Sequence, residues 1–436
     1  MEANSSVRLP GHSTSRLYCR TTGSRSAPRV EEKTMKKTIL VVVCVAAATA
    51  FPVVPSQAAQ AVLVVDDNGA QCPEAAFTTI QAAITAASPG DEIRVCAGTY
   101  NEVVTVNKAN LRLVGPAAAP RGTACRQVGV PDPTSQAIIQ SADGAGTVRL
   151  AENGIRFSRF TVQNNTSSYG IVMSAAHSGH QVRQNLIQGN VFGVYFNSSG
   201  AILSEVEQNC IRQNNEPGSA SGNGVYSDAG LKNADIEDNT FSGNENSGVL
   251  LDALAPGGVD NVRVNRNTSL EDRAFAFIFK SSNVAVGSNT IRDNFGAPGI
   301  FFGDSNTNLR ITSNLIERGF LGVRANAFGL SPNTNVTITG NTIRNSESST
   351  VGHGISVAAN SLANSVISRN IATGNAGDGI RIDAGGNGGN TISFNVARGS
   401  GMLDCRDNTT GTGTGGTANT WVRNIGPNAA PPSICL

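Results

Sequence analysis

Charged and aromatic side chains are scarce in this sequence. Of its 436 residues, 15% are charged, 5% are aromatic and one is tryptophan, and the formal net charge is +1. After residue 37 the only lysines are Lys108, Lys232 and Lys280. We therefore expect no nucleic-acid partner, because proteins that bind nucleic acids usually display a strongly basic surface. Beyond residue 61 no apolar run approaches the ~18 residues of a spanning helix, so no membrane contact is predicted after removal of a targeting segment.

The amino-terminal part of the chain has the features of a secretion signal. Met35–Lys37 form a basic start, residues 39–50 are mostly apolar, and residues 56–58 and 59–61 are both small-x-small cleavage sites. We predict a signal peptide at 35–61, so that the mature protein is secreted and extracellular. Residues 1–34 are predicted to be an upstream segment without structure; the alternative is an unusually long n-region.

Two of the eight cysteines lie in the segment that would be removed, which leaves Cys72, Cys96, Cys125, Cys210, Cys405 and Cys435. An even number of cysteines in an exported chain fits disulfide bonds. Proximity in sequence predicts the pairs Cys72–Cys96 and Cys405–Cys435, and elimination leaves Cys125–Cys210. No Cys-x-x-Cys or Cys/His pair has the spacing of metal ligands, so no metal site is predicted.

An asparagine motif, in most cases followed after one residue by an aliphatic residue, recurs through the chain. The motifs begin at Asn185, Asn209, Asn239, Asn267, Asn289, Asn314, Asn341, Asn370 and Asn395. The shortest step runs from Asn267 to Asn289 and the longest from Asn209 to Asn239. Self-similarity at a period of roughly 20–50 residues is typical of solenoids, propellers and repeat arrays.

The residues inside each repeat favour a β-solenoid. Short alternating runs of β-branched residues precede each Asn, as at Val284 and Val286, and a Gly-led run such as residues 299–302 follows it. Alternation with period two indicates a strand with one buried face. A propeller blade would need four longer strands, and a leucine-rich repeat would show a Leu-x-x-Leu-x-Leu pattern. We therefore predict about nine stacked coils of a parallel β-helix, with the asparagines in a buried ladder.

Both ends of this region resemble a known superfamily. Residues 76–87 are the one good candidate for an amphipathic helix, and Gly90–Val95 and Gly98–Glu102 follow it. These motifs resemble the opening of the pectin-lyase-like superfamily of secreted β-helix proteins. The tail, including Asp404–Asp407 and Gly416–Trp421, resembles the closing segment of actinobacterial right-handed β-helix repeat proteins.

This resemblance covers about residues 62–436. It implies an all-β, right-handed parallel β-helix with a short N-terminal capping helix and a disulfide-closed C-terminal tail. It says little about chemistry, because the superfamily contains hydrolases, lyases, esterases and non-enzymatic binders. The predicted parts are the N-terminal cap and first coils at 62–115, a proline-rich irregular insertion with degenerate coils at 116–150, β-helix repeats at 151–400 and a C-terminal cap at 401–436.

A stripe of apolar and polar side chains is predicted on one outer face. Counted from the Gly that opens each strand, residues one and three should point inward and residues two and four outward. The second position holds Val172, Tyr195, Tyr226, Leu250, Ile278, Phe301, Arg324, Ser356 and Arg381, and the fourth includes Asn197, Asp228, Asp252 and Lys280. Aromatic rings beside polar groups suit a sugar chain, so we predict carbohydrate binding by Tyr195, Asn197, Tyr226, Phe301 and Arg324. The alternative is that loops cover this stripe.

Asp228, Asp252 and Lys280 are the candidate catalytic residues, because they fall on successive coils about 5 Å apart. Two carboxylates at this separation would suit glycoside hydrolysis. A lyase would instead use Lys280 as the base, with Arg324 stabilising the enolate. Ladders of charge also arise on any β-helix face without a catalytic role.

Other motifs point to structure rather than chemistry. Gly352-His353-Gly354 resembles a polygalacturonase motif, but the aspartate motifs that accompany it in those enzymes are missing, so His353 is predicted to be structural. No cofactor is predicted. Ca²⁺ would suit the acidic column, although no Asp-rich loop motif supports it.

Two functions remain open from the sequence. The first is a secreted protein that associates with extracellular polysaccharide, either as a binder or as a divergent hydrolase or lyase. The second is a non-catalytic extracellular structural or surface-binding protein. The fold favours the first and the lack of a complete catalytic motif favours the second, so the sequence does not decide whether the protein is an enzyme.

Overall fold

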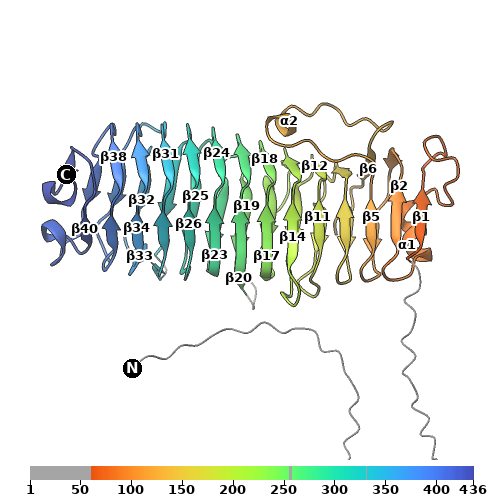
Figure 1. Cartoon of the computed structure of the whole chain (residues 1–436), viewed down its shortest axis with the longest axis horizontal. Coiled ribbons are helices and arrows are strands. Elements are labelled where there is room, and N and C mark those ends of the chain that lie inside the picture. The colour runs from red at the N-terminus through yellow and green to blue at the C-terminus, as the bar shows by residue number, and fades with distance from the viewer. Residues whose placement is uncertain (1–59, 255–257, 330) are drawn as a thin grey trace, which may run out of the picture. The chain divides into compact units, whose positions relative to one another are not determined.

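The computed structural model describes residues 60–254, 258–329 and 331–436. The predicted segment 1–34 and the predicted signal peptide, apart from its last two residues, lie outside the described residues. The described residues form one unit in which strands stack along a long axis, with the amino end of the stack at β1 and the carboxyl end near β40 (Figure 1). None of the helices in the described ranges is long and apolar enough to cross a membrane.

Three parallel sheets run the length of this stack, and each complete coil contributes one strand to each sheet. The 14-stranded sheet contains β1 (Val62–Val65), β2 (Glu92–Val95), β5 (Arg112–Val114), β8 (Arg156–Ser158), β11 (Gln181–Arg183), β14 (Ser204–Glu207), β17 (Leu231–Glu237), β20 (Val259–Asn265), β23 (Ser281–Gly287), β26 (Arg310–Thr312), β30 (Thr337–Thr339), β34 (Val366–Ser368), β37 (Thr391–Ser393) and β40 (Thr420–Val422). The 12-stranded sheet contains β3 (Gly98–Tyr100), β6 (Ala137–Gln140), β9 (Phe160–Gln163), β12 (Leu186–Gln188), β15 (Cys210–Arg212), β18 (Thr240–Ser242), β21 (Thr268–Leu270), β24 (Thr290–Arg292), β27 (Leu315–Glu317), β31 (Thr342–Arg344), β35 (Ile371–Thr373) and β38 (Val396–Arg398). The 13-stranded sheet contains β4 (Val104–Val106), β7 (Val148–Leu150), β10 (Tyr169–Met173), β13 (Phe192–Phe196), β16 (Asn223–Ser227), β19 (Ser247–Asp252), β22 (Ala276–Phe279), β25 (Pro298–Gly303), β28 (Leu321–Ala325), β32 (Ile355–Val357), β36 (Ile380–Ile382), β39 (Cys405–Asp407) and β41 (Ala429–Ala430).

The predicted all-β parallel solenoid is confirmed. Its interior consists of columns of apolar side chains, one residue from each coil. In the 14-stranded sheet one such column is fully or almost fully buried: Leu113, Phe157, Val182, Val206, Ile236, Val264, Val286, Ile311, Ile338, Ile367, Ile392 and Trp421. A three-residue strand has little stability alone, so each coil depends on the coils above and below it.

The asparagine ladder lies at the corner between the 14-stranded and the 12-stranded sheets. In each step the backbone N–H and the side-chain Nδ2 of one Asn donate hydrogen bonds to Oδ1 of the Asn in the next coil. Asn289, for example, donates both bonds to Asn314 at 3.0 and 2.9 Å and receives two from Asn267. The ladder begins at Asn185 and ends at Asn424, and its members are buried.

The stack is longer than the sequence motif indicated. The prediction of about nine coils was too low, because the structure has about 12 turns. Before Asn185 the ladder position is held by Phe160, whose N–H donates to Asn185 Oδ1 at 3.0 Å. The ring of Phe160 stacks on Phe157 with centroids 4.4 Å apart. The first coils therefore contain no asparagine at this corner, so a count of the asparagine motif does not include them.

Two short helices lie outside the repeat pattern. Helix α1 (Ile80–Ala86) forms where the amphipathic helix at 76–87 was predicted, and Thr79 caps its start by accepting a hydrogen bond from the Ala82 N–H. Helix α2 (Thr123–Arg126) belongs to an arm that leaves the stack after β5 and returns at β6 (Figure 1). Residues 137–140 and 148–150 are regular strands, so within the predicted insertion at 116–150 the irregular part ends before residue 137.

Candidate functional site

The predicted outward stripe lies on the 13-stranded sheet. In register, its second-position residues are Val172, Tyr195, Tyr226, Leu250, Phe277, Phe301, Arg324, Ser356 and Arg381. The inward assignment of positions one and three is confirmed, since residues such as Val194 and Phe196 are fully buried.

The expected register was wrong in one coil. Phe277, and not Ile278, lies beside Leu250 and Phe301, and Ile278 is fully buried in the interior. The reason is that Phe275 stands where the other coils have the opening Gly, so there was no Gly from which to count. For the same reason Phe279, and not Lys280, is the direct neighbour of Asp252.

Four aromatic rings form a cluster at the amino-terminal half of this sheet. Tyr169, Tyr195 and Tyr226 lie one above another, with centroid separations of 5.0 and 6.0 Å and nearly parallel rings. Phe192 meets all three edge-on at 4.4–6.0 Å. Together with Asp228 and the turns around them, these rings line a cleft of about 390 Å³, and the three tyrosines are half-buried. We call this group of five residues the aromatic cleft.

Asp228 fixes two of the three stacked tyrosines. Its Oδ1 accepts a hydrogen bond from the Tyr195 hydroxyl at 2.6 Å, and its Oδ2 accepts one from the Tyr226 hydroxyl at 2.8 Å. Burial, followed by the hydrogen bond to Asp228, raises the pKa of both tyrosines above the usual value of 10. The hydroxyls therefore stay protonated in the ordinary pH range, so the cleft presents fixed rings and a carboxylate whose two oxygens are both engaged.

Asp252 and Lys280 form a second group beside the aromatic cleft. Asp228 and Asp252 each directly follow the registered pair Ser227 and Leu251, so they occupy neighbouring coils as predicted. Lys280 Nζ lies 3.6 Å from Asp252 Oδ1. Burial raises the pKa of Asp252, and the Lys280 charge opposes that rise. The structure therefore brings the three predicted catalytic residues into one region, as one Tyr-bound carboxylate and one ion pair.

Three predicted sugar-binding residues have different surroundings. Asn197 is fully buried, and its Oδ1 accepts hydrogen bonds from Ser227 Oγ at 2.9 Å and the Ala229 N–H at 3.1 Å, so the expectation that it faces solvent was wrong. Phe301 is only 7% exposed, because the rings of Phe277, Phe279 and Phe328 surround it at 5.5–5.7 Å. Arg324 is half-buried, in register with Phe301 and Ser356.

The burial of Phe301 agrees with the alternative considered for the stripe, in which loops cover it. Phe328, from the turn after β28, stacks on it and is itself 62% exposed. At this end of the stripe the exposed ring is therefore Phe328. At the amino-terminal end the tyrosines are covered less, so the stripe is open in one part and covered in another.

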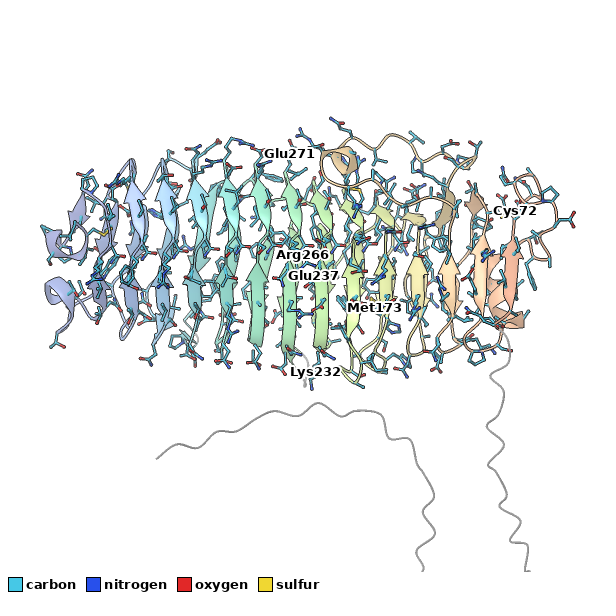
Figure 2. All side chains as sticks on the ribbon, in the orientation of Figure 1. Cys72, Met173, Lys232, Glu237, Arg266 and Glu271 are labelled. Carbon is cyan, nitrogen blue, oxygen red and sulfur yellow. A yellow bond between two sulfur atoms is a disulfide. The ribbon has the colours of Figure 1, made fainter. Side chains whose placement is uncertain are left out.

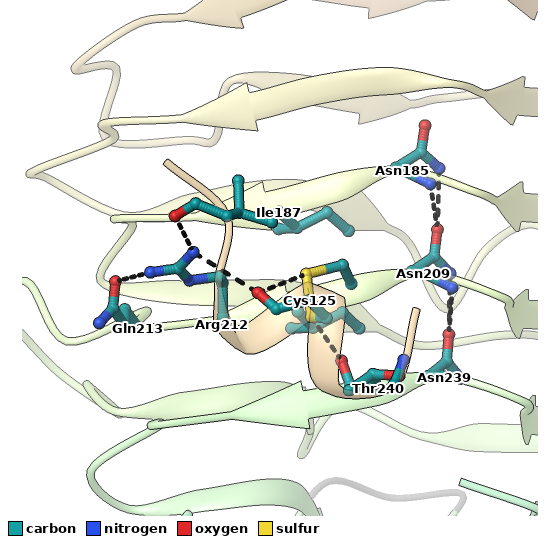
Figure 3. Close-up of a disulfide and its surroundings, with 12 residues drawn as sticks. Cys125, Asn185, Ile187, Asn209, Arg212, Gln213, Asn239 and Thr240 are labelled. Carbon is teal, nitrogen blue, oxygen red and sulfur yellow. Dashed lines mark hydrogen bonds between the residues drawn. A yellow bond between two sulfur atoms is a disulfide. The ribbon is translucent and has the colours of Figure 1, made fainter. Parts of the chain in front are cut away.

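All three predicted disulfides are present: Cys72–Cys96, Cys125–Cys210 and Cys405–Cys435. The bond from Cys125 holds α2 against the 12-stranded sheet (Figure 3). Beside it, Arg212 donates to the Val128 carbonyl at 2.7 Å and the Gly122 N–H donates to Thr240 Oγ1 at 2.8 Å. The arm therefore covers the outer face of β15 and β18.

His353 is a structural residue in this geometry. It is 3% exposed, and its Nδ1 accepts a hydrogen bond from the Asp378 N–H at 2.8 Å. Burial lowers its pKa, although the nearby Asp378 carboxylate opposes the shift. Within the described residues, one set of three potential metal-ligand atoms lies together, from Asp66, Cys72 and Cys96, and the two cysteines are joined in a disulfide.

Sequence reasoning missed Tyr169 and Phe192. Each stands directly before the Gly of its strand, a position that was interpreted only as part of the turn. The register places the two residues side by side. An aromatic residue directly before the Gly in each of two successive coils was the signal that could have identified the cleft.

Two family models match parts of the chain. One, described as a right handed beta helix region, matches residues 193–326, and one, described as periplasmic copper-binding protein (NosD), matches residues 121–255. Among solved structures, the A-modules of the mannuronan C-5 epimerases AlgE6 and AlgE4 from Azotobacter vinelandii are similar to this chain. Each is 14% identical to this chain, and each match covers 80% of this chain. The match covers 92% of the AlgE6 module with a TM-score of 0.52, and 94% of the AlgE4 module with a TM-score of 0.53. No curated protein sequence matches.

The matches and the geometry define one class of protein, the right-handed parallel β-helix. Within that class, the chain has the fold of the pectin-lyase-like superfamily, as the motifs at its two ends predicted.

Proposed function

We propose that this protein is secreted and binds an extracellular polysaccharide through the aromatic cleft. The observation that supports this most directly is the stack of Tyr169, Tyr195 and Tyr226, held by Phe192 and by Asp228. Aromatic rings offer flat apolar faces to the C–H faces of sugars, and their hydroxyl groups and the neighbouring carboxylate suit sugar hydroxyls. Rings that are already fixed lose little conformational freedom on binding.

Two further observations support this proposal. Three disulfides fit an oxidising, extracellular environment. The two similar epimerases are named for mannuronan, a polysaccharide, and they share the β-helix fold. The match to the NosD model does not lead us to a copper site, because the candidate ligand set at Asp66 includes two disulfide-bonded cysteines and lies outside the matched residues.

Replacement of the central rings tests the proposal. In Tyr195→Ser/Tyr226→Ser, we expect affinity for the bound polysaccharide to fall by about tenfold or more, because each stacked ring typically contributes about 1 kcal/mol beyond its buried area. Wild type is first screened by affinity electrophoresis against uronate-containing and neutral polysaccharides. Tyr195→Phe/Tyr226→Phe keeps the rings and should retain most of the binding.

Phe394→Ser is the matched control, since it removes an exposed ring at a different corner of the solenoid. A folded Tyr195→Ser/Tyr226→Ser variant that binds as tightly as wild type would contradict the proposal. So would an equal loss of binding in Phe394→Ser. The alternative function, a non-catalytic structural protein without glycan affinity, predicts no retention of wild type on any polysaccharide.

The Asp252–Lys280 pair supports a second candidate function, cleavage of the bound polysaccharide. A half-buried carboxyl group with a raised pKa is suited to donate a proton to a glycosidic oxygen, while Asp228 lies on the neighbouring coil. In a lyase, Lys280 would be the base, and Arg324 lies on β28, two strands beyond β22. Assays for new reducing ends and for unsaturated products distinguish the two reactions. Loss of either product in Asp252→Asn, with polysaccharide binding retained, would support catalysis, and no product from wild type would contradict it.

A further inference from the structure

A groove rich in arginine lies on the 14-stranded sheet, on a different sheet from the aromatic cleft. It runs across β5, β8 and β11 near the amino end of the stack and has a volume of about 290 Å³. Its lining includes Arg112, Arg156, Arg159 and Arg183, with serine, glutamine and valine between them. None of its lining residues is acidic, so the groove is a concentrated positive site on a chain with a formal net charge of only +1.

Two of these arginines are direct neighbours. Arg112 and Arg156 are register partners on adjacent strands, so their backbones are about 4.8 Å apart. Like charges in directly opposed positions destabilise a sheet unless a counter-charge lies nearby. Arg112 reaches Glu92 at 3.3 Å, on the side away from Arg156. Exposed Arg156 makes no ion pair or side-chain hydrogen bond with any described residue.

The other two arginines extend the groove toward the carboxyl end and the corner. Arg159 is exposed in a left-handed corner, and its Nε donates to Gln184 Oε1 at 3.2 Å, a neutral partner. Arg183 pairs with Glu207 and lies 3.7 Å from Glu205, and its own side chain remains 42% exposed. The groove therefore contains two arginines that have no acidic partner among the described residues, Arg156 and Arg159, flanked by two arginines that remain accessible.

Some arginines further along the same sheet are neutralised by acidic residues. Arg263 binds Asp235, and Arg266 binds Asp238 at 2.9 Å. Arg266 also binds Glu237, and these two residues lie near the middle of the stack (Figure 2). Arg310 on β26 and Arg369 after β34 also make no ion pair with a described residue, but Arg156 and Arg159 differ from them in lying together in one groove.

We propose that this groove binds the acidic groups of a polysaccharide chain, either uronate carboxylates or sulfate esters. The guanidinium group is planar and pairs with such anions through two parallel hydrogen bonds. The four arginines are spread over three successive coils, so they fit charges repeated along a polymer better than one small anion. This site goes beyond the proposed function, because the aromatic cleft needs only the apolar faces and hydroxyls of sugars.

The test compares two charge-matched double variants in the full chain. Arg156→Gln/Arg159→Gln removes the two arginines without acidic partners. Arg310→Gln/Arg369→Gln is the control. Like the groove variant, it removes one arginine from a strand of this sheet and one from a left-handed corner, so both variants lose the same charge from the same kinds of backbone position. Both variants alter exposed residues, and their melting temperatures establish that they are folded. Binding is measured for polygalacturonate, heparin, a neutral glucan and duplex DNA at two salt concentrations.

We expect Arg156→Gln/Arg159→Gln to weaken binding of polygalacturonate, heparin or both by about tenfold at low salt, and less at high salt because of screening. The control variant and the neutral glucan should show no such change. Comparison of polygalacturonate with heparin identifies the carboxylate or the sulfate as the preferred group. Equal loss in both variants, no loss in either, or binding of DNA alone would overturn the proposal. It would also be overturned if the groove variant dissociates a dimer of the wild-type chain, since the acidic part of a second copy would then be the occupant.

Discussion

Asp272 occupies a position in a second ladder that asparagine holds in the neighbouring coils. Asn190, Asn214 and Asn244 each donate to the Oδ1 of the next coil, and Asp272 Oδ1 accepts from the Asn244 N–H and Nδ2, both at 2.8 Å. Its Oδ2 accepts from Ser269 Oγ at 2.6 Å. Unlike an amide, a carboxylate has no hydrogen to donate to the following coil. There the Oδ1 of Asn294 is buried and has no hydrogen-bond partner among the described residues.

This carboxyl group makes the stability of the fold depend on pH. Asp272 is fully buried, and desolvation raises its pKa from 3.8 to about 7. Between these two values the folded state binds more protons than the unfolded state, so the free energy of unfolding falls as the pH rises from about 4 to about 7. A shift of this size corresponds to about 4 kcal/mol over the full range, of which about 3 kcal/mol lies between pH 5 and pH 8.

Asp272→Asn should remove this dependence and restore a donor to the ladder. We expect the variant to unfold at a higher temperature than wild type at pH 8, and the difference between them to shrink by about 3 kcal/mol at pH 5. Thermal and urea unfolding followed by circular dichroism at both pH values measure the difference. Asp260→Asn, a change at a partly exposed carboxylate that accepts a hydrogen bond from Asn283, is the control and should show no such pH effect. An equal stability difference between Asp272→Asn and wild type at pH 5 and at pH 8 would contradict this prediction.

Three further predictions concern the stability of the solenoid and its arm. Asn289→Ala leaves the buried donors and acceptors of both neighbouring coils without partners, so it should lower the free energy of unfolding by about 3 kcal/mol. Asn428→Ala, a change at an exposed side chain, should lower it by almost nothing. Equal shifts in melting temperature for the two variants would contradict this. His180 is fully buried, neither of its ring nitrogens has a hydrogen-bond partner among the described residues, and desolvation lowers its pKa to about 4. The fold should therefore lose about 3 kcal/mol of stability as the pH falls from 6.5 to 4, and melting temperatures should show His180→Leu to be nearly free of that loss. Cys125→Ser/Cys210→Ser should make residues 116–136 more sensitive to limited proteolysis while the rest of the solenoid stays intact, and unchanged cleavage would show that hydrogen bonds alone hold the arm.

The features that repeat were predictable from the sequence. Asparagine at a sharp corner and β-branched residues on alternate positions recur because every coil has the same backbone geometry, so one coil explains the others. The disulfide pairs were also accessible, because Cys72–Cys96 and Cys405–Cys435 are close in sequence within the two ends. These features depend on residue types that recur in each coil or lie close together in sequence.

The features that break the repeat were not predictable. The register around Phe277 is set by hydrogen bonds to β19 and β25, and the sequence of that coil alone, with Phe275 in place of Gly, gives no starting point. The burial of Phe301 depends on Phe328, which comes from a turn one coil further on. Whether an outward side chain meets solvent is decided by neighbours that a single repeat does not contain.

The asparagine ladder also has a direction. At every step from Asn185 to Asn424 the donors belong to the earlier coil and the acceptor to the later one. As a nascent chain leaves the ribosome amino end first, each new coil supplies the acceptor that the previous coil requires. The unfinished stack always ends in two unpaired N–H groups, which cost more to bury than an unpaired carbonyl. The order of synthesis and the order of hydrogen bonding therefore coincide, and the carbonyl of Asn424, which ends the ladder, accepts the N–H of Leu436.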